Sequence, residues 1–229
     1  MLPSGTSPLR AAAFFDVDGT LIDRTIVHYY IYLRRRTLHP MLSAVWLPHY
    51  LARCALYLAI DKFDRARFNR LFYRDYRGLD AATIKAMADD CYREVLRPRR
   101  FDAGFQAAQR HRERGERIVL VTGSIDFLMA PLARDLGASD VLSVRLVERD
   151  GRFTGELDGP PLTESEKARR IRDYAKEHGV DLAASHAYGD SIADAPMLEC
   201  VGHPCAVNPG KSLRRLAERR GWTILDWKR

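Results

Sequence analysis

Short, nearly continuous apolar runs alternate along this chain with longer stretches in which apolar residues recur at helical spacing. Runs of the first kind predict buried β-strands, and the longer stretches predict amphipathic helices. The predicted strands are AAAFFDV (11–17), RIVLVTGS (117–124), SHAYGD (185–190) and WTILDW (222–227), and the predicted helices cover 102–114, 126–136 and 164–178.

The alternation of strands and helices predicts an α/β fold, a doubly wound parallel sheet with helices on both faces. Ligands bind such sheets beyond the carboxyl ends of the strands. Asp16, Thr122 and Asp190 each lie at the end of a predicted strand, so we expect them to meet in one crevice. The segment 145–157 departs from the pattern and predicts a β-hairpin that turns at its Asp-Gly pair.

Residues 24–100 interrupt the alternation, because they are helical in composition and contain no convincing strand. We therefore predict an inserted helical cap domain at 24–100 and a Rossmann-like core domain formed by 1–23 and 101–229. The first ten residues, MLPSGTSPLR, contain no apolar core, so we expect an irregular tail and no secretory signal.

Within the predicted cap, 16 of the 20 residues from 41 to 60 are apolar. A run of this length raises the possibility of a transmembrane helix. Pro48, His49 and Arg53 interrupt it, so a span is disfavoured. Two alternatives stay open: the helices pack on each other and on the core, or an apolar face flanked by the arginines at 34–36 meets a membrane surface.

The positive charge of the chain is concentrated in the same segment. The net charge is +7, and residues 24–100 hold 16 Lys and Arg against 7 Asp and Glu, which leaves 21 against 23 elsewhere. This distribution indicates a solvated basic surface or a surface that meets anions. No recognised nucleic-acid motif accompanies the charge, so no nucleic-acid partner is expected. Four cysteines without CxxC spacing predict free thiols and a cytoplasmic protein.

Four short motifs bear on chemistry: DVDGT at 16–20, TGS at 122–124, Lys167, and GDSIAD at 189–194. Two acids one residue apart after a buried strand are costly unless a positive charge compensates them. Each motif alone is weak, and Lys167 lies in ESEKARR, which by itself is typical of a solvated helix start. Their order along the chain and their places at strand ends make the combination specific.

In this order the motifs resemble those of the haloacid dehalogenase (HAD) superfamily, and within it the phosphoserine-phosphatase-like branch, subfamily IB. The resemblance runs from about Ala11 to the C-terminus, although in the cap it extends only to position and helical character. It implies a Mg²⁺-dependent phosphomonoester phosphatase that acts through an aspartyl-phosphate intermediate.

The resemblance also implies a role for each motif residue. Asp16 is expected to be the nucleophile and Asp18 the general acid and base, with Lys167 neutralising Asp16 and the phosphoryl oxygens. Phosphate is expected to bind at Thr122, Gly123 and Ser124, and Mg²⁺ at Asp16, the Asp18 backbone carbonyl, Asp190 and Asp194.

Two departures from phosphoserine phosphatases put the substrate in question. The glutamate that receives the substrate ammonium is replaced by Thr25, with Asp23 two residues early, and Ala193 takes the place of an asparagine. The cap is basic, apolar and rich in tyrosine. We therefore carry two substrate hypotheses: a small phosphomonoester such as phosphoserine or histidinol phosphate, and an amphiphilic lysophosphatidate-like lipid phosphate.

Two functions of other kinds are carried as alternatives. A phosphomutase or phosphotransferase of the same superfamily is one, although the long helical cap counts against it. A non-catalytic binding module at a membrane surface is the other, although such a module would have been expected to lose Asp16, Asp18 or Asp190. Peripheral membrane contact through the cap is part of the hypothesis, and the oligomeric state is left open.

Overall fold

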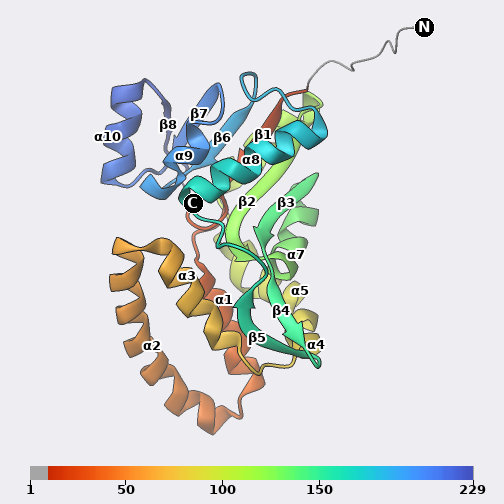
Figure 1. The fold of residues 1–229 in the computed structure, drawn as a ribbon, viewed down its shortest axis with the longest axis vertical. Helices are drawn as coiled ribbons and strands as arrows, with labels where there is room; N and C mark the ends of the chain where they lie inside the picture. The colour runs from red at the N-terminus through yellow and green to blue at the C-terminus, as the bar shows by residue number, and fades with distance from the viewer. Residues whose placement is uncertain (1–9, 229) are drawn as a thin grey trace, which may run out of the picture.

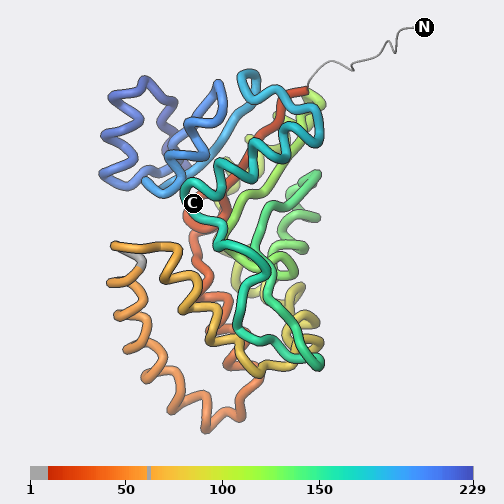
Figure 2. The backbone as a smooth tube through the Cα atoms, viewed as in Figure 1, coloured from red at the N-terminus to blue at the C-terminus, as the bar shows by residue number. Residues whose placement is uncertain are grey.

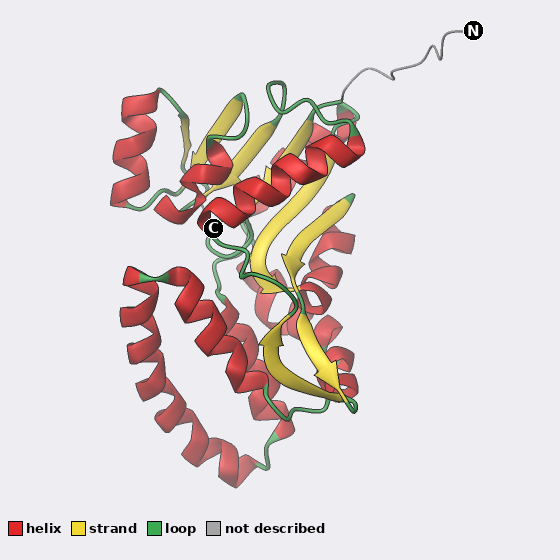
Figure 3. Ribbon diagram, viewed as in Figure 1, coloured by secondary structure: helices red, strands yellow, loops and turns green. Residues whose placement is uncertain are grey.

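The computed structural model describes residues 10–228, apart from the side chains of residues 61 and 62. The predicted irregular tail lies almost wholly outside the described residues. The chain folds into an upper α/β layer structure and a lower group of helices, joined where the ends of the central strands approach the helices (Figures 1 and 3).

A six-stranded sheet, with all its strands parallel, forms the centre of the fold, in the order β3-β2-β1-β6-β7-β8. The predicted α/β fold with a parallel sheet is therefore confirmed. The order reverses between β1 and β6, and at such a switch point the loops leaving neighbouring strands separate and open a crevice. The strands are β1 (Ala12–Phe15), β2 (Arg117–Ile125), β3 (Asp140–Val144), β6 (His186–Gly189), β7 (His203–Val207) and β8 (Thr223–Leu225).

Helices cover both faces of this sheet. One face carries the helices that follow the cap and β2, and the other carries the helices that lead into and out of β6 and β7, with α8 crossing in front of the strands in Figure 1. The helices are α6 (Asp102–Glu113), α7 (Asp126–Leu136), α8 (Glu164–His178), α9 (Ala195–Leu198) and α10 (Lys211–Arg220), with a short 3₁₀ turn η4 (Ile192–Asp194).

The lower group is formed by the segment between β1 and α6. Its longest member is α2, which runs along the outside of the group (Figure 2). Its core is aromatic: Tyr30 contacts the rings of Tyr50, Phe72 and Tyr76. The elements are α1 (Ile26–Thr37), α2 (Pro40–Phe63), α3 (Arg65–Tyr73), η1 (Arg74–Tyr76), α4 (Ala81–Ala86), α5 (Ala88–Cys91), η2 (Tyr92–Leu96) and η3 (Arg97–Arg99).

The predicted hairpin is present as β4 (Leu146–Arg149) and β5 (Arg152–Leu157). Asp150 and Gly151 both adopt positive φ, at 51° and 73°, as a tight turn matched to the twist of the strands requires. The hairpin forms a sheet of its own and extends to the lower helices, where the ring of Phe153 contacts Tyr76. The hairpin therefore connects the sheet layer to the lower group.

Most predicted elements are confirmed, and β3, β7 and α10 are among the regular elements that were missed. The predicted helices at 126–136 and 164–178 match α7 and α8 residue for residue. The missed strand β3 lies at the edge of the sheet and is only partly buried, so it has no continuous apolar run. The missed strand β7 reads HPCAV, in which histidine and proline hide the apolar pattern, and α10 is so charged that only two of its residues are buried.

The apolar run at 41–60 forms part of the single helix α2, which contains Pro48 without ending there. Among the described residues, no helix is long and apolar enough to cross a membrane. The preference against a transmembrane span is therefore confirmed for the described part of the chain.

A cluster of histidines at the amino end of the sheet predicts acid-sensitive stability. Burial, together with nearby His111 and His203, lowers the pKa of His186 to about 4, against about 6.5 in an unfolded chain. Glu116 raises this pKa and Arg114 lowers it. Within the described residues, the buried Nδ1 of His186 has no hydrogen-bond partner.

Between about pH 4 and about pH 6.5, His186 is therefore protonated in the unfolded chain and neutral in the folded chain. Stability should fall as the pH drops from about 6.5 towards about 4. We expect His186→Gln to weaken this acid dependence, measured as urea midpoints at neutral pH and near pH 5. An unchanged pH dependence in the variant would contradict the assignment.

Candidate functional site

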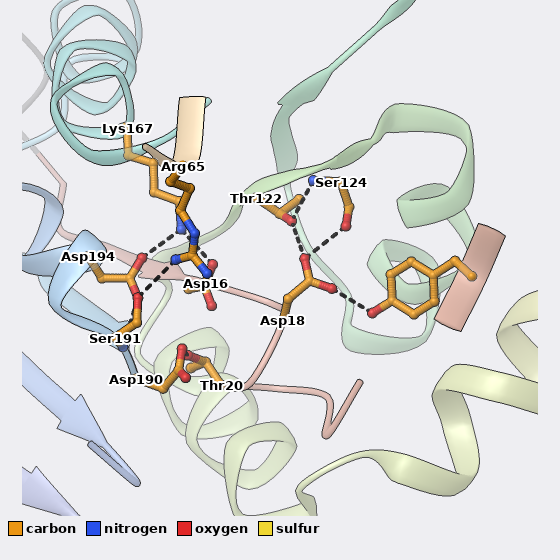
Figure 4. A network of polar contacts seen from close by, with 11 residues as sticks. Asp16, Asp18, Thr20, Arg65, Thr122, Ser124, Lys167, Asp190, Ser191 and Asp194 are labelled. Carbon is orange, nitrogen blue, oxygen red and sulfur yellow. Dashed lines mark hydrogen bonds and ion pairs between the residues drawn. The ribbon is translucent and has the colours of Figure 1, made fainter. Parts of the chain in front are cut away.

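Buried acids converge on one lysine where the central strands end. Asp16 follows β1 and is 5% exposed, and Asp194 ends η4 and is 2% exposed. Lys167, in the first turn of α8, donates hydrogen bonds to Oδ1 of Asp16 at 2.6 Å and to Oδ1 of Asp194 at 2.7 Å (Figure 4). Lys167 is 6% exposed. Its position excludes the alternative that it is a solvated helix-start residue.

Asp18 lies on the other side of this group and is held by three hydroxyls. Its Oδ1 accepts a hydrogen bond from Tyr29 at 2.8 Å, and its Oδ2 accepts from Ser124 at 2.8 Å and Thr122 at 3.1 Å (Figure 4). The backbone N–H of Ser124 donates to the Thr122 hydroxyl at 3.0 Å. The TGS motif is thus placed against Asp18, and the side chains of Thr122 and Ser124 are fully buried.

Asp190 follows β6 and closes the site from the third strand. Thr20 donates a hydrogen bond to Oδ1 of Asp190 at 3.2 Å. Gly19 adopts φ +99°, and a Cβ at this position would lie 2.5 Å from Oδ2 of Asp190. Two separate constraints therefore require glycine at this position of the DVDGT motif: the positive φ of its backbone and the close approach of the Asp190 carboxylate.

The charges of these groups depend strongly on one another. Burial raises the pKa of Asp16 well above its usual range, with a further contribution from Asp194, although Lys167 lowers it. Burial and the charge of Asp194 also raise the pKa of Asp190 to about 7. Burial opposes ionisation of Asp194 too, but Lys167 holds its pKa below the usual value. The negative charge therefore exceeds what one lysine compensates.

The surplus of carboxylates fits a hard divalent cation. Asp16, Asp190 and Asp194 each offer an oxygen, and these oxygens lie within 4.8 Å of one another. Carboxylate oxygens are the ligands that Mg²⁺ prefers. The donor set of this site therefore suits Mg²⁺, and a cation there would supply the missing positive charge.

A cavity of about 300 Å³ lies next to the acids, between the sheet ends and the lower helices. Asp16, Asp18, Gly123 and Asp190 line its floor. Its remaining walls are mixed: an apolar part comes mainly from α1, α2 and α3, and a polar part carries both signs of charge. The apolar residues are Ile26, Val27, Cys54, Tyr57, Leu58, Phe68 and Leu162, and the polar ones include Thr25, His28, Arg65, Asn69 and Glu164.

All eight sequence-predicted site residues lie around this crevice, although only Gly123 of the TGS motif lines the cavity. Thr25 lines the cavity as well, but its hydroxyl is engaged with the His28 ring at 3.1 Å. The side chain of Asp23 is 48% exposed.

The sequence reasoning missed the residues that the lower helices contribute. The sequence indicates only that the cap is rich in tyrosine, and one of these tyrosines, Tyr29, reaches Asp18. Arg65 donates a hydrogen bond to Ser191 at 3.2 Å and so connects α3 to the fourth motif. Tyr73 donates to the backbone carbonyl of Gly123 at 2.5 Å. No local sequence signal marks them, because their roles arise from contacts between distant segments.

Comparison with known proteins agrees with this geometry. The family model described as haloacid dehalogenase-like hydrolase matches residues 13–199. A phosphoserine phosphatase of Mycobacterium tuberculosis is 34% identical over 221 residues, covering 96% of this chain and 72% of the relative. A histidinol-phosphatase of Neisseria meningitidis is 26% identical over 242 residues, covering 96% of this chain and all of the relative (100%).

Solved structures show the same fold. A protein of unknown function from Bordetella pertussis superposes with a TM-score of 0.81 at 26% identity, covering 96% of this chain and 100% of that one. A substrate-bound phosphoserine phosphatase superposes with a TM-score of 0.71 at 17% identity, covering 96% and 94%. At 17% identity, the similarity to this phosphoserine phosphatase shows only that the two proteins share a fold.

The ion-pair geometry predicts a large cost for removing Lys167. In Lys167→Met, Asp16 and Asp194 would stay buried without their cation, so we expect the free energy of unfolding to fall by roughly 3–5 kcal/mol. The measurement is urea denaturation in the presence of a chelator. Lys176→Met, an exposed position on the same helix, is the matched control and should change stability by less than about 0.5 kcal/mol. Equal effects of the two substitutions would contradict the ion-pair assignment.

Proposed function

This chain belongs to the haloacid dehalogenase-like hydrolases and is a phosphomonoester hydrolase, and we propose that it works through a phosphorylated aspartate at Asp16 with Mg²⁺ as cofactor. The observation that carries the proposal is the position of Asp16. It lines the cavity, contacts Lys167 at 2.6 Å, and has a second acid, Asp18, two residues away on the cavity floor.

In the first step, a carboxylate oxygen of Asp16 attacks phosphorus, and the bond between phosphorus and the ester oxygen breaks. Asp18 delivers a proton to the departing alkoxide, which leaves as an alcohol. Burial raises the pKa of Asp18, although hydrogen bonds from Tyr29 and Ser124 lower it. The raised pKa favours a carboxyl that can hold the proton it must deliver.

In the second step, water attacks phosphorus and the bond to Asp16 breaks. Asp18, now ionised, accepts a proton from this water, so inorganic phosphate leaves and both acids return to their starting states. The hydroxyls of Tyr29 and Ser124 keep Asp18 in one orientation through both steps. Lys167 remains beside Asp16 and offsets negative charge on the phosphoryl oxygens.

Mg²⁺ would be held by Asp16, Asp190 and the backbone carbonyl of Asp18, with Asp194 supporting the site. When bound, it supplies positive charge that stabilises the phosphoryl oxygens. The phosphoryl group itself would bind against the segment 122–124. Gly123 is nearest to the cavity, and the Thr122 hydroxyl would exchange its hydrogen bond to Asp18 for one to phosphate.

We propose that residues 24–100 act as a cap domain over a core of 1–23 and 101–229 and select the substrate. The cap brings Arg65 to the cavity, and the core brings Glu164. Glu164 adopts φ +45° at the start of α8, and such strained backbones concentrate at functional sites. An arginine and a glutamate suit a small substrate with an amino group and a second anionic group, as in phosphoserine.

The primary substrate class we propose is therefore a small, amino-bearing phosphomonoester of the phosphoserine or histidinol phosphate type, used in the cytoplasm. The names of the two relatives above support this class. A lysophosphatidate-like lipid phosphate is the second candidate. The apolar wall of the cavity, with Val27, Leu58 and Phe68, favours it.

Removing the cation tests the cofactor assignment. A chelator should abolish hydrolysis of an aryl phosphate, and Mg²⁺ should restore it. Asp190→Asn should raise the Mg²⁺ concentration for half-maximal activity at least about tenfold. Substituting a residue that only supports a metal ligand already lowers metal affinity by about this factor. Asp173→Asn, at a half-exposed ion pair on α8, is the control and should behave as wild type. Hydrolysis that is indifferent to the chelator would overturn the assignment.

A substrate panel tests the choice of substrate. Phosphoserine and histidinol phosphate should show higher kcat/KM than lysophosphatidate. Glu164→Gln should lower kcat/KM for the preferred amino-bearing substrate by roughly tenfold, the worth of one charged hydrogen bond. Glu177→Gln, an exposed position on the same helix, is the control. Faster turnover of lysophosphatidate, with no effect of Glu164→Gln, would reject the amino-bearing class in favour of the lipid.

A further inference from the structure

The outward face of α2 is unusually apolar for a protein surface. Eight large hydrophobic side chains of the described residues are exposed, and seven of them lie on this one helix. Large contiguous apolar patches on a protein surface generally mark an interaction site. The seven are Met41 (75% exposed), Leu42 (61%), Val45 (76%), Leu51 (51%), Leu56 (59%), Leu58 (72%) and Phe63 (86%); the other is Ile192.

Packing inside the protein does not account for these residues. The inner face of α2 already contributes Tyr50 and Tyr57 to the core, 3% exposed each, and Trp46 stacks on Tyr50 with ring centroids 4.7 Å apart. A helix whose apolar residues extend well beyond the stripe that faces the core needs an apolar environment on those further sides as well. The outer face lies on the periphery of the molecule in Figure 1, so its cover must come from outside the described chain.

The charges around α2 indicate the nature of that cover. The helix contains no acidic residue before position 61. Exposed Arg35 lies shortly before it, and exposed Arg67 and Arg70 lie shortly after it. An apolar helix face with arginines at both ends complements the interface of an anionic bilayer, where acyl chains receive the side chains and lipid phosphates receive the guanidinium groups.

We propose that α2 docks this protein on the surface of an anionic membrane, with Met41, Val45 and the other exposed side chains inserted at the headgroup boundary. A second copy of the chain is a poorer occupant. In a two-fold pair of α2 helices, whether parallel or antiparallel, arginine-bearing ends would face one another, and like charges at an interface are unfavourable.

The docking surface is continuous with the cavity of the proposed active site. Leu58 belongs to the exposed face and also lines the cavity, and Cys54 and Tyr57 of the same helix line the cavity beside it. A docked protein would therefore carry its cavity near the lipid headgroups. This surface goes beyond the proposed function, because it depends on α2 and not on which phosphomonoester is hydrolysed.

Vesicle flotation of the full chain tests the docking. The wild-type protein should float with vesicles of phosphatidylglycerol and phosphatidylcholine and bind less to phosphatidylcholine alone, with binding reduced by salt. Met41→Gln combined with Val45→Gln should weaken partitioning about tenfold or more, since two apolar side chains are lost. Arg35→Gln should weaken binding to the anionic vesicles about fivefold.

Matched controls separate the surface from general effects. Ile192→Gln removes the one exposed large hydrophobic side chain of the described residues that lies outside α2. Arg149→Gln removes an exposed arginine from the hairpin, which lies on the opposite side of the lower group from α2 (Figure 1). Both should float as wild type does. Circular dichroism of the α2 variants should match the wild type, because Met41 and Val45 are mostly exposed in the folded protein.

Three results would overturn the proposal. The protein could stay in solution with every vesicle at low salt, or the double variant could float as well as the wild type. Alternatively, size-exclusion chromatography could show a dimer that Val45→Gln dissociates, which would assign the face to a second copy. The test is separable from catalysis, since Asp16→Asn should float normally whether or not it hydrolyses phosphate esters.

Discussion

The interaction on which this site depends is the buried ion pair between Lys167 and two carboxylates, Asp16 and Asp194. All three side chains are almost inaccessible to water, so their charges can persist only because they lie within hydrogen-bond distance of each other. Asp190 adds a further acid to the same crevice, and one ammonium cannot balance all of them. The need for further positive charge makes the crevice suitable for a divalent cation, and such a cation would in turn attract an incoming phosphate.

The rest of the fold serves to bring these groups together. Three strands end at the crevice, and the switch in strand order opens it. Gly19 permits the close approach of Asp190, and Tyr29 reaches from α1 to fix Asp18. The lower helices close the cavity and give it both charged and apolar walls. The reacting acids thus lie at the sheet ends, whereas we propose that the helices inserted after β1 supply selectivity and membrane contact.

Much of this arrangement could be predicted from the sequence, for identifiable reasons. Asp16 and Asp190 directly follow apolar strands, Thr122 lies towards the end of a third, and the carboxyl ends of parallel strands meet at one edge of the sheet. The hairpin followed from its Asp-Gly turn. Lys167 was different, because its local sequence is that of a surface helix and only the resemblance to the superfamily pointed to the site.

The parts that could not be predicted depend on contacts between distant segments. Tyr29, Arg65 and Tyr73 belong to helices whose sequence gives no indication of what they touch in the folded chain. The strand β7 was missed because its histidine and proline break the apolar pattern. The apolar run of α2 was recognised, but only the fold shows which of its side chains remain uncovered.

The most direct test of the central claim is to identify the covalent intermediate. The protein is mixed briefly with a phosphomonoester substrate, quenched in acid, digested and analysed by mass spectrometry with reduction of any acyl phosphate. The account predicts that Asp16, the first carboxylate of DVDGT, is recovered as homoserine, the alcohol that reduction of an aspartyl phosphate leaves behind, and that Asp16→Asn gives no homoserine at this position. Phosphorylation at another residue, or turnover retained in Asp16→Asn, would contradict it.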